Sequence, residues 1–285
     1  MLKKLLKSLK MLTKTTYIFC LLFFLFSTTG CKNITSSHNH GQQRIISLSP
    51  SLTQMVFKLD SGKKLVGVTR YDYFPSEVKK IPKVGGFLDV DPERLLSFKP
   101  DLVLLTEMHL DLKRKLDKYN IESLVLKTRS IEEVYKSLKQ LGKKLNKSTL
   151  AKKLIVSLKK NLKPKSCKSK PRVLITLGHA DNSLKNIVAA GPGTYLDQLL
   201  KLAGGKNAVN KGPASYPNLG LESIVQLSPD IILDIVKTGN EKKDVWTKVP
   251  FKNEPKIFPL SSPHISSPGV KMPEVLNLFH NKICK

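Results

Sequence analysis

The stretch PERLLSFKPDLVLL, Pro92 to Leu105, decides the fold, because it recurs 129 residues later as GLESIVQLSPDIILD, Gly220 to Asp234. Each copy places apolar residues at helical spacing before a Pro-Asp pair, and a run of Leu, Val or Ile follows that pair. This order predicts a short helix, a proline stop and a buried strand. A second echo, VFKLDSGKKLV at 56–66 and LLKLAGGKNAV at 199–209, keeps the same order. We therefore expect two lobes built on one plan.

Strands alternate with helices in both halves of the chain, which predicts an α/β fold with parallel, doubly wound sheets. The N-terminal lobe is expected over 44–129 and the C-terminal lobe over 164–285. Between them, 130–163 carries apolar residues at helical period with lysines elsewhere, and Gly142 is its one weak point as a helix. This segment predicts one long helix, or two helices with a break near Asn146, joining the lobes.

The formal charge of +27 raises the question of nucleic-acid binding. Only six of the 49 basic residues are arginine, and the lysines are spread along the whole length. Arginine is the better reader of bases and phosphates, and no nucleic-acid recognition motif is found. The composition favours a solvated lysine-rich surface, with some attraction to an anionic membrane face, and excludes a nucleic-acid partner.

The N-terminus predicts export. Residues 1–16 carry five lysines and no acidic residue, and an apolar run follows over 17–26. The sequence STTGC then resembles a bacterial lipobox, although Thr28 stands where leucine is usual. We expect a lipoprotein signal peptide over 1–30, lipidation of Cys31 and a location in the cell envelope. A flexible tether over 31–43 follows, and its two histidines, His38 and His40, are expected to be solvated.

Two cysteines remain after Cys20 and Cys31 are accounted for. A disulfide between Cys167 and Cys284 is chemically allowed outside the cytoplasm, and the sequence leaves its formation open.

Ligands of open parallel sheets gather beyond the carboxyl ends of the strands. The residues that follow the predicted strands form an inventory rich in aromatic and imidazole groups, suited to a bulky, partly apolar ligand or a metal complex: Tyr71, Tyr73, Glu107, His109, His179, Lys237 and His264. A direct Zn or Mn receptor is the alternative, with His109, His179 and His264 as ligands, joined by Glu107. The glycine-rich GPGTYLDQ, 191–198, lacks the ending of a P-loop, and enzyme motifs are missing. We therefore expect neither an enzyme nor a resident cofactor.

The quoted repeat, together with RIISLSP at 44–50 and AAGPGTYLDQLLKLAGG at 189–205, resembles the cobalamin and iron-complex substrate-binding proteins of ABC importers. The likeness covers 44–284 and is closest to the cobalamin binders. It implies two Rossmann-like lobes with parallel sheets, joined by a long interdomain helix, and a monomer that holds its ligand between the lobes. Cobalamin is the implied ligand, with haem or a ferric siderophore as alternatives, and an ABC permease is the implied partner.

The resemblance also assigns roles to residues. Glu93 and Glu222 match the carboxylates that dock onto permease arginines. Tyr71 matches a ligand-facing tyrosine, Phe87 takes the place of an aromatic that stacks near the corrin, and Tyr216 matches a second-lobe aromatic. Two departures stand out. Ala203 replaces a family cysteine, so the family's disulfide cannot form, and SPHI at 262–265 replaces a more acidic and aromatic segment.

Overall fold

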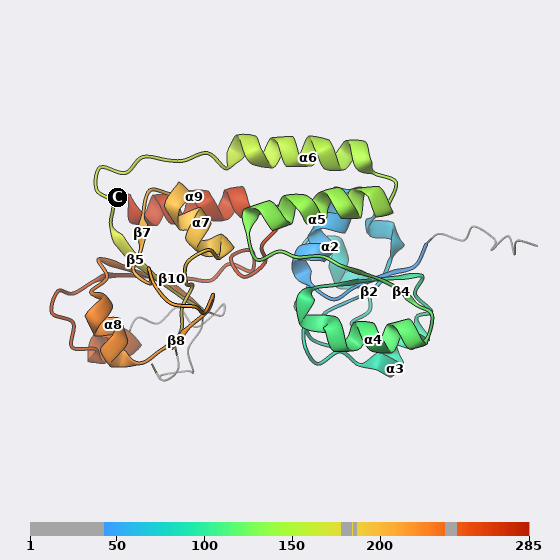
Figure 1. Ribbon diagram of the computed structural model, residues 1–285, viewed down its shortest axis with the longest axis horizontal. Coiled ribbons are helices and arrows are strands. Elements are labelled where there is room, and N and C mark those ends of the chain that lie inside the picture. Colours follow the sequence, from blue (N-terminus) through green and yellow to red (C-terminus); the bar gives the residue numbers. More distant parts are fainter. Residues whose placement is uncertain (1–42, 178–183, 185–186, 237–243, 285) are drawn as a thin grey trace, which may run out of the picture. The chain divides into compact units, whose positions relative to one another are not determined.

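The computed structural model describes residues 43–177, 184, 187–236 and 244–284 (Figure 1). Its first sheet has four parallel strands in the spatial order β2-β1-β3-β4. The strands and the helices around them are β1 (Ile45–Ser47), α2 (Pro50–Lys58), η1 (Gly62–Lys64), β2 (Leu65–Val68), η2 (Ser76–Lys80), α3 (Pro92–Ser97), β3 (Leu102–Leu105), η3 (Glu107–His109), α4 (Leu110–Lys118) and β4 (Glu122–Val125).

The second sheet also has four parallel strands, in the order β10-β9-β5-β7, and a two-stranded antiparallel sheet, β6-β8, accompanies it. Its elements are β5 (Arg172–Leu177), β6 (Ile187–Val188), α7 (Tyr195–Leu202), β7 (Lys206–Asn207), β8 (Asn218–Leu219), α8 (Leu221–Leu227), β9 (Ile231–Ile235), η4 (Asp244–Lys248), β10 (Lys256–Leu260) and α9 (Met272–Ile283). Matching β1 with β5, β3 with β9 and β4 with β10 makes the two orders the same. The α/β fold with parallel sheets is confirmed.

The repeat is reproduced in the hydrogen bonds around each proline stop. In the first lobe, the Arg44 backbone N–H donates to the Asp101 carboxylate at 2.7 Å, and the Arg44 side chain donates to the carbonyl of Phe98. In the second lobe, the Arg172 N–H donates to the Asp230 carboxylate at 2.7 Å, and its side chain bonds the corresponding carbonyl at the end of α8. The aspartate after each proline thus ties the α3 or α8 turn to the first strand of its lobe.

The linking segment is two helices rather than one. α5 (Ile131–Lys144) and α6 (Ser148–Asn161) are separated at Asn146, which adopts a left-handed conformation with φ of 58°. Gly142 is the residue that lets them meet: a Cβ built there would lie 2.4 Å from the Cβ of Ala151, and its carbonyl accepts from the Lys147 N–H at 2.7 Å. The expectation of a single long interdomain helix is therefore wrong, and the alternative of a break near Asn146 is correct.

The two lobes share a hydrophobic core. Its largest cluster contains buried residues of both sheets together with Leu138 and Leu141 of α5 and Leu158 of α6. Two smaller clusters complete the core, one in the first lobe and one in the second. All three clusters lie within residues 45–284. We infer that a chain beginning at Lys32 contains everything that the core requires. Among the described residues, no helix has the length and apolar character needed to cross a bilayer.

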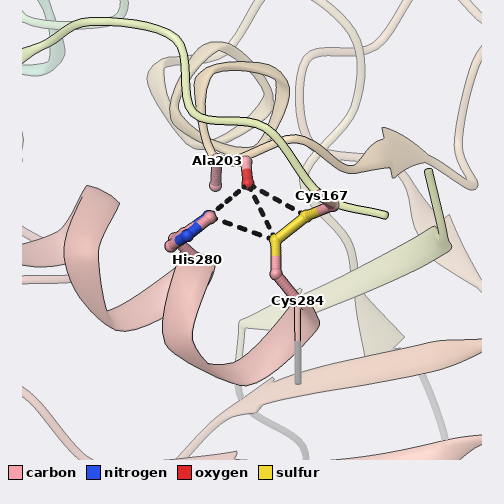
Figure 2. Close-up of a disulfide and its surroundings, with 4 residues drawn as sticks. All are labelled: Cys167, Ala203, His280 and Cys284. Atoms are coloured by element: carbon pink, nitrogen blue, oxygen red, sulfur yellow. Dashed lines mark hydrogen bonds between the residues drawn. A yellow bond between two sulfur atoms is a disulfide. The ribbon is translucent and has the colours of Figure 1, made fainter. Parts of the chain in front are cut away.

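A disulfide joins Cys167, in the connection after α6, to Cys284, at the end of α9 (Figure 2). Their Cα atoms lie 5.1 Å apart. The carbonyl oxygen of Ala203 faces both sulfurs and accepts a hydrogen bond from Nδ1 of His280 at 3.0 Å. Ala203 therefore lies beside the disulfide instead of contributing a sulfur to it, and Cys167 supplies the second thiol from a different segment.

Candidate functional site

The loop after β2 presents two tyrosines to solvent. Tyr71 is 48% exposed and Tyr73 is 59% exposed. Between them, the buried Asp72 accepts hydrogen bonds from the backbone N–H of Thr69 at 2.9 Å and from its hydroxyl at 2.5 Å. Burial raises the pKa of Asp72, although the hydrogen bonds from Thr69 oppose that shift. Asp72 fixes the turn, and the tyrosines on either side of it point outward.

A tight hairpin over 85–90 is held against the tyrosine loop. The Arg70 N–H donates to the carbonyl of Gly85 at 2.8 Å, and the Arg70 guanidinium pairs with Asp89 at 2.9 Å. Gly85 has φ of 127°, and a Cβ there would lie 2.6 Å from the carbonyl oxygen of Asp89, so the turn requires glycine. The hairpin brings the half-buried Phe87 and the exposed Leu88 next to the tyrosine loop.

His109 is buried, and both of its ring nitrogens have partners. Nδ1 accepts from the Thr106 N–H at 3.1 Å, so Nε2 carries the proton and donates to the carbonyl of Phe87 at 2.6 Å. The two rings stack edge-on with centroids 4.9 Å apart. Burial lowers the pKa of His109, which keeps the ring neutral. In this structure His109 positions Phe87, and it has no nitrogen left to offer a ligand.

His264 meets the tyrosine loop from the second half of the chain. Its ring packs edge-on against Phe74 with centroids 5.2 Å apart, and the Lys271 ammonium lies 4.6 Å from the centre of the same phenyl ring. Nδ1 of His264 is buried without a hydrogen-bond partner among the described residues. Burial lowers the pKa of His264, Lys271 adds to that effect, and Glu274 opposes it. The imidazole is therefore neutral near pH 7 with one nitrogen free.

Tyr216 lies beside the start of α7. The segment before Pro217 packs on the glycine-rich loop, where the Gly191 N–H donates to the carbonyl of Ser215 at 2.8 Å and a Cβ on Gly191 would lie 2.7 Å from the carbonyl oxygen of Ala214. Burial raises the pKa of Tyr216 to about 12. The neighbouring Tyr195 is buried with no partner for its hydroxyl among the described residues. Tyr216 is thus the phenol of this pair that reaches solvent, and Tyr195 belongs to the core beneath it.

The glycine-rich loop is not an anion site of its own. Thr194 caps α7 by accepting from the Asp197 N–H at 3.2 Å, and the Asp197 carboxylate accepts from the Gly193 N–H at 2.9 Å. The helix start is thus neutralised by a carboxylate of the same helix.

Sequence reasoning missed three exposed apolar side chains in the first lobe. Leu88 is 66% exposed on the hairpin, while Met108 and Leu110 are 61% and 49% exposed just beyond β3. β1 lies between β2 and β3 in the sheet, so these side chains follow two strands that flank a common neighbour. Exposed apolar side chains that gather in one region mark a binding surface, whereas single scattered ones do not. The signal that could have found them is their position, since each follows a residue already singled out. Together with Tyr71 and Tyr73 they make a set of exposed apolar and aromatic side chains that follow β2 and β3, the two strands flanking β1.

Glu93 and Glu222 occupy the same place in their lobes. Each stands in the first turn of its short helix, α3 or α8, and is exposed. Neither carboxylate has an ion-pair partner among the described residues. Their side chains are therefore free to meet a cation on another molecule.

The ligand set of the metal-receptor hypothesis is not assembled in the described residues. Glu107 pairs with Arg129 at 2.7 Å, and the nitrogens of His109 are occupied as described above. The one group of metal-binding side chains found there is Cys167, His280 and Cys284, and its two sulfurs are bonded to each other. His179 and Cys31 lie outside the described residues.

The fold is that of a two-lobed α/β protein with two parallel sheets. Residues 45–245 match the family model described as periplasmic binding protein, so the chain belongs to that family. It is 31% identical over 247 residues to YvrC of Bacillus subtilis (strain 168), an uncharacterized ABC transporter substrate-binding lipoprotein, over 81% of this chain and 77% of that protein. The chain is therefore a substrate-binding protein of an ABC transporter.

Two other similar proteins are named for different ligands. The high-affinity heme uptake system protein IsdE of Staphylococcus aureus (strain MRSA252) is 29% identical over 245 residues, covering 83% of this chain and 82% of IsdE. The structure of S. aureus IsdE complexed with heme superimposes with a TM-score of 0.71 at 23% identity, over 86% of this chain and 100% of that one. The structure of the periplasmic vitamin B12 binding protein BtuF of Vibrio cholerae superimposes with a TM-score of 0.66 at 17% identity. The match covers 84% of this chain and 95% of BtuF.

Proposed function

We propose that the protein captures a metal tetrapyrrole, cobalamin or haem, and delivers it to an ABC permease. The observation that carries the proposal is the exposed aromatic and apolar surface at the carboxyl ends of β2 and β3, where Tyr71, Tyr73 and Leu88 stand out from the lobe. A flat macrocycle of this size needs broad apolar contact and a few polar groups to orient it. The relatives that bind heme or vitamin B12 support the same class of ligand.

The side chains of the surface also suit the central metal of such a ligand. Haem iron in proteins is held by histidine, methionine or tyrosine side chains. The neutral His264 imidazole, the Met108 thioether and the tyrosine phenols are all of this kind. Phe87, placed by His109, adds a ring for stacking. A direct Zn or Mn receptor has less support, because His109 and Glu107 have internal partners.

Titration of the purified protein with hemin and with cyanocobalamin tests the proposal. We expect one of them to raise the unfolding temperature, since a ligand present at 100 times its Kd stabilises the folded state by about 2.7 kcal/mol. Binding of haem would also shift its Soret band. The paired change Tyr71→Ala with Tyr73→Ala should weaken that ligand at least about tenfold, the order expected for losing aromatic contacts.

Tyr119→Ala is the matched control, because Tyr119 is 64% exposed but stands between α4 and β4, at the opposite edge of the sheet. It should leave the affinity unchanged. If neither macrocycle changes the unfolding temperature or the spectrum, the proposal is wrong. If the tyrosine pair and Tyr119 have equal effects, the binding surface has been misplaced.

We further propose that Glu93 and Glu222 dock the two lobes onto arginines of the permease. Their shared position on α3 and α8, their exposure and their lack of internal partners support this role. The double change to alanine should abolish ligand uptake by cells while the purified protein keeps its affinity for the ligand. Loss of affinity in the purified variant would contradict the docking role.

Attachment through a lipid on Cys31 is part of the same proposal. It is supported by the STTGC sequence and by the similarity to YvrC, which is named as a lipoprotein. Mass spectrometry of the protein extracted from membranes should find a diacylglycerol on an N-terminal Cys31, and Cys31→Ala should release the protein from the membrane fraction. An unmodified N-terminus at another residue would contradict the assignment.

A further inference from the structure

The middle of the chain has an unusual charge distribution. From Val134 to Ala180 it holds 14 lysines and arginines and not one aspartate or glutamate. The linear sequence spreads these residues evenly. The structure places much of this run on α5 and α6, which pack against each other, and on the connection that leads to β5 (Figure 1).

α6 gathers its lysines on one side. Successive residues of a helix are rotated by about 100°, which puts Lys152, Lys153, Val156 and Lys160 within one angular sector. We call these four residues, together with Lys163 two positions beyond the helix end, the α6 basic face. All five are exposed, whereas the opposite side of α6 is buried in the core. None of the four ammonium groups has an ion-pair partner among the described residues.

A shallow hollow continues this face at the start of α6. It has a volume of about 520 Å³ and is lined by Asn146, Lys147, Ser148, Thr149, Leu150 and Lys153. The first turn of the helix has no acidic residue, and no side chain caps its backbone N–H groups. The partial positive charge of the helix start therefore adds to that of the lysines. Lys153 belongs to both the hollow and the basic face, so the two form one continuous electropositive surface.

Val156 decides what kind of anion this surface fits. It is 67% exposed and lies at the centre of the lysine sector. A soluble polyanion would gain nothing from an apolar group there. Binding to a bilayer is strengthened by it, because an apolar side chain enters the interface while the lysines extend their ammonium groups to the headgroup phosphates. We propose that the α6 basic face docks on a membrane surface of anionic phospholipids.

The proposal does not require the lipid anchor. It predicts that the folded part of the protein binds such a surface without Cys31, and an anchor would only keep the membrane close. The chain of residues 32–285 contains the whole core, as shown above, and lacks the anchoring cysteine. It is therefore the protein to test.

Cosedimentation with vesicles of phosphatidylcholine containing 30% phosphatidylglycerol, about the anionic fraction needed for strong attraction, is the experiment. We expect binding at 0.1 M salt, roughly where the Debye length is 10 Å, little binding to pure phosphatidylcholine, and loss of binding as salt is raised. Changing the four lysines of the face to glutamine should weaken binding by about tenfold or more.

The control changes Lys79, Lys80, Lys115 and Lys118 to glutamine. These four are exposed lysines of the first lobe, outside α6, and their loss removes the same charge. Binding that survives the control and fails in the face variant supports the proposal. An equal loss in both variants shows that only net charge acts and overturns it. Binding to soluble polyphosphate with no binding to the anionic vesicles overturns it as well.

Val156→Trp gives an independent readout. The chain has a single tryptophan, Trp246, which is buried and bonds Asp234, so its emission should not respond to lipid. We expect the new indole to shift its emission to the blue with anionic vesicles only. Absence of that shift under conditions where the protein sediments with the vesicles would overturn the assigned face. Ligand binding, measured separately, is expected to be unchanged in every variant, which keeps this inference distinct from the proposed function.

Discussion

Removal of the Cys167–Cys284 disulfide should destabilise the second lobe strongly. The two cysteines are 117 residues apart, and the loop they close runs from β5 through α9, so it contains the second sheet. In the chain-entropy relation, a cross-link over a loop of this length disfavours the unfolded state by about 5 kcal/mol. Native disulfides of exported domains are worth about 2–5 kcal/mol when measured by removal, so we expect a loss within that range.

Urea unfolding of the 32–285 chain with Cys167→Ser and Cys284→Ser measures this loss. Only these two cysteines remain in that chain, so disulfide exchange with others does not interfere. A loss of 3 kcal/mol or more, near the middle of the range, should lower the unfolding temperature by about 10 °C for a protein of this size. Wild-type protein treated with dithiothreitol should unfold at the same urea concentration as the double variant.

Two outcomes would refute this reasoning. The first is an unchanged urea midpoint in the double variant, which would mean that the loop contributes no entropy to the unfolded state. The second is the recovery of two free thiols from unreduced native protein. A single Cys284→Ser variant serves as a check, because it should match the double variant if the only role of the cysteines is their mutual bond.

Three further changes test local packing and the buried titratable groups. Gly142→Val should lower the free energy of unfolding by about 1–3 kcal/mol, because the valine side chain would collide with Ala151. Gln140→Ala, on the exposed side of α5, is the control and should leave the free energy of unfolding unchanged. Equal urea midpoints for the two variants would contradict the close contact. His109→Leu should cost about 1–3 kcal/mol at pH 7 by leaving the two backbone partners of the imidazole unsatisfied. Because burial lowers the pKa of His109, the wild type should lose stability as the pH falls below 6.5. The difference in urea midpoint between wild type and His109→Leu should therefore be smaller at pH 5 than at pH 7. A constant difference would argue against a buried neutral ring. Burial raises the pKa of Asp72, so the charged carboxylate destabilises the folded wild type as the pH rises above the ordinary aspartate range. The free energy of unfolding of Asp72→Asn should therefore increase relative to that of wild type between pH 4 and pH 7. A relative decrease over this range would be inconsistent with the burial of Asp72.

The repeat was readable from the sequence because each of its parts is a local signal. Each copy has a proline that stops a helix and an apolar run that follows it, and both signals act within about ten residues. The sequence of each copy therefore predicts the same helix and strand. The hydrogen bonds from Arg44 to Asp101 and from Arg172 to Asp230 carry the same repeat into three dimensions. They could not be foreseen, because each joins residues 57 or 58 positions apart.

The aromatic surface was anticipated only in part. Tyr71 and Tyr73 follow a strand directly, and strand ends are visible in the sequence. His109 follows a strand as well, yet it turned inward, because Thr106 and the carbonyl of Phe87 satisfy both of its nitrogens. Whether a polar side chain faces solvent or its own lobe depends on partners from other segments, and no spacing rule supplies them.

The sequence by itself determined the class of fold, the duplication and the membership of the binding-protein family, because periodicity and stop signals are local. The tertiary structure decided the break at Asn146, the partner of Cys284 and the side of α6 on which the lysines gather. Each of these depends on contacts between different elements: Gly142 of α5 against Ala151 of α6, Cys167 against the end of α9, and the core against the opposite side of α6. Burial selects among the arrangements that local propensity allows, and burial exists only once the chain has folded.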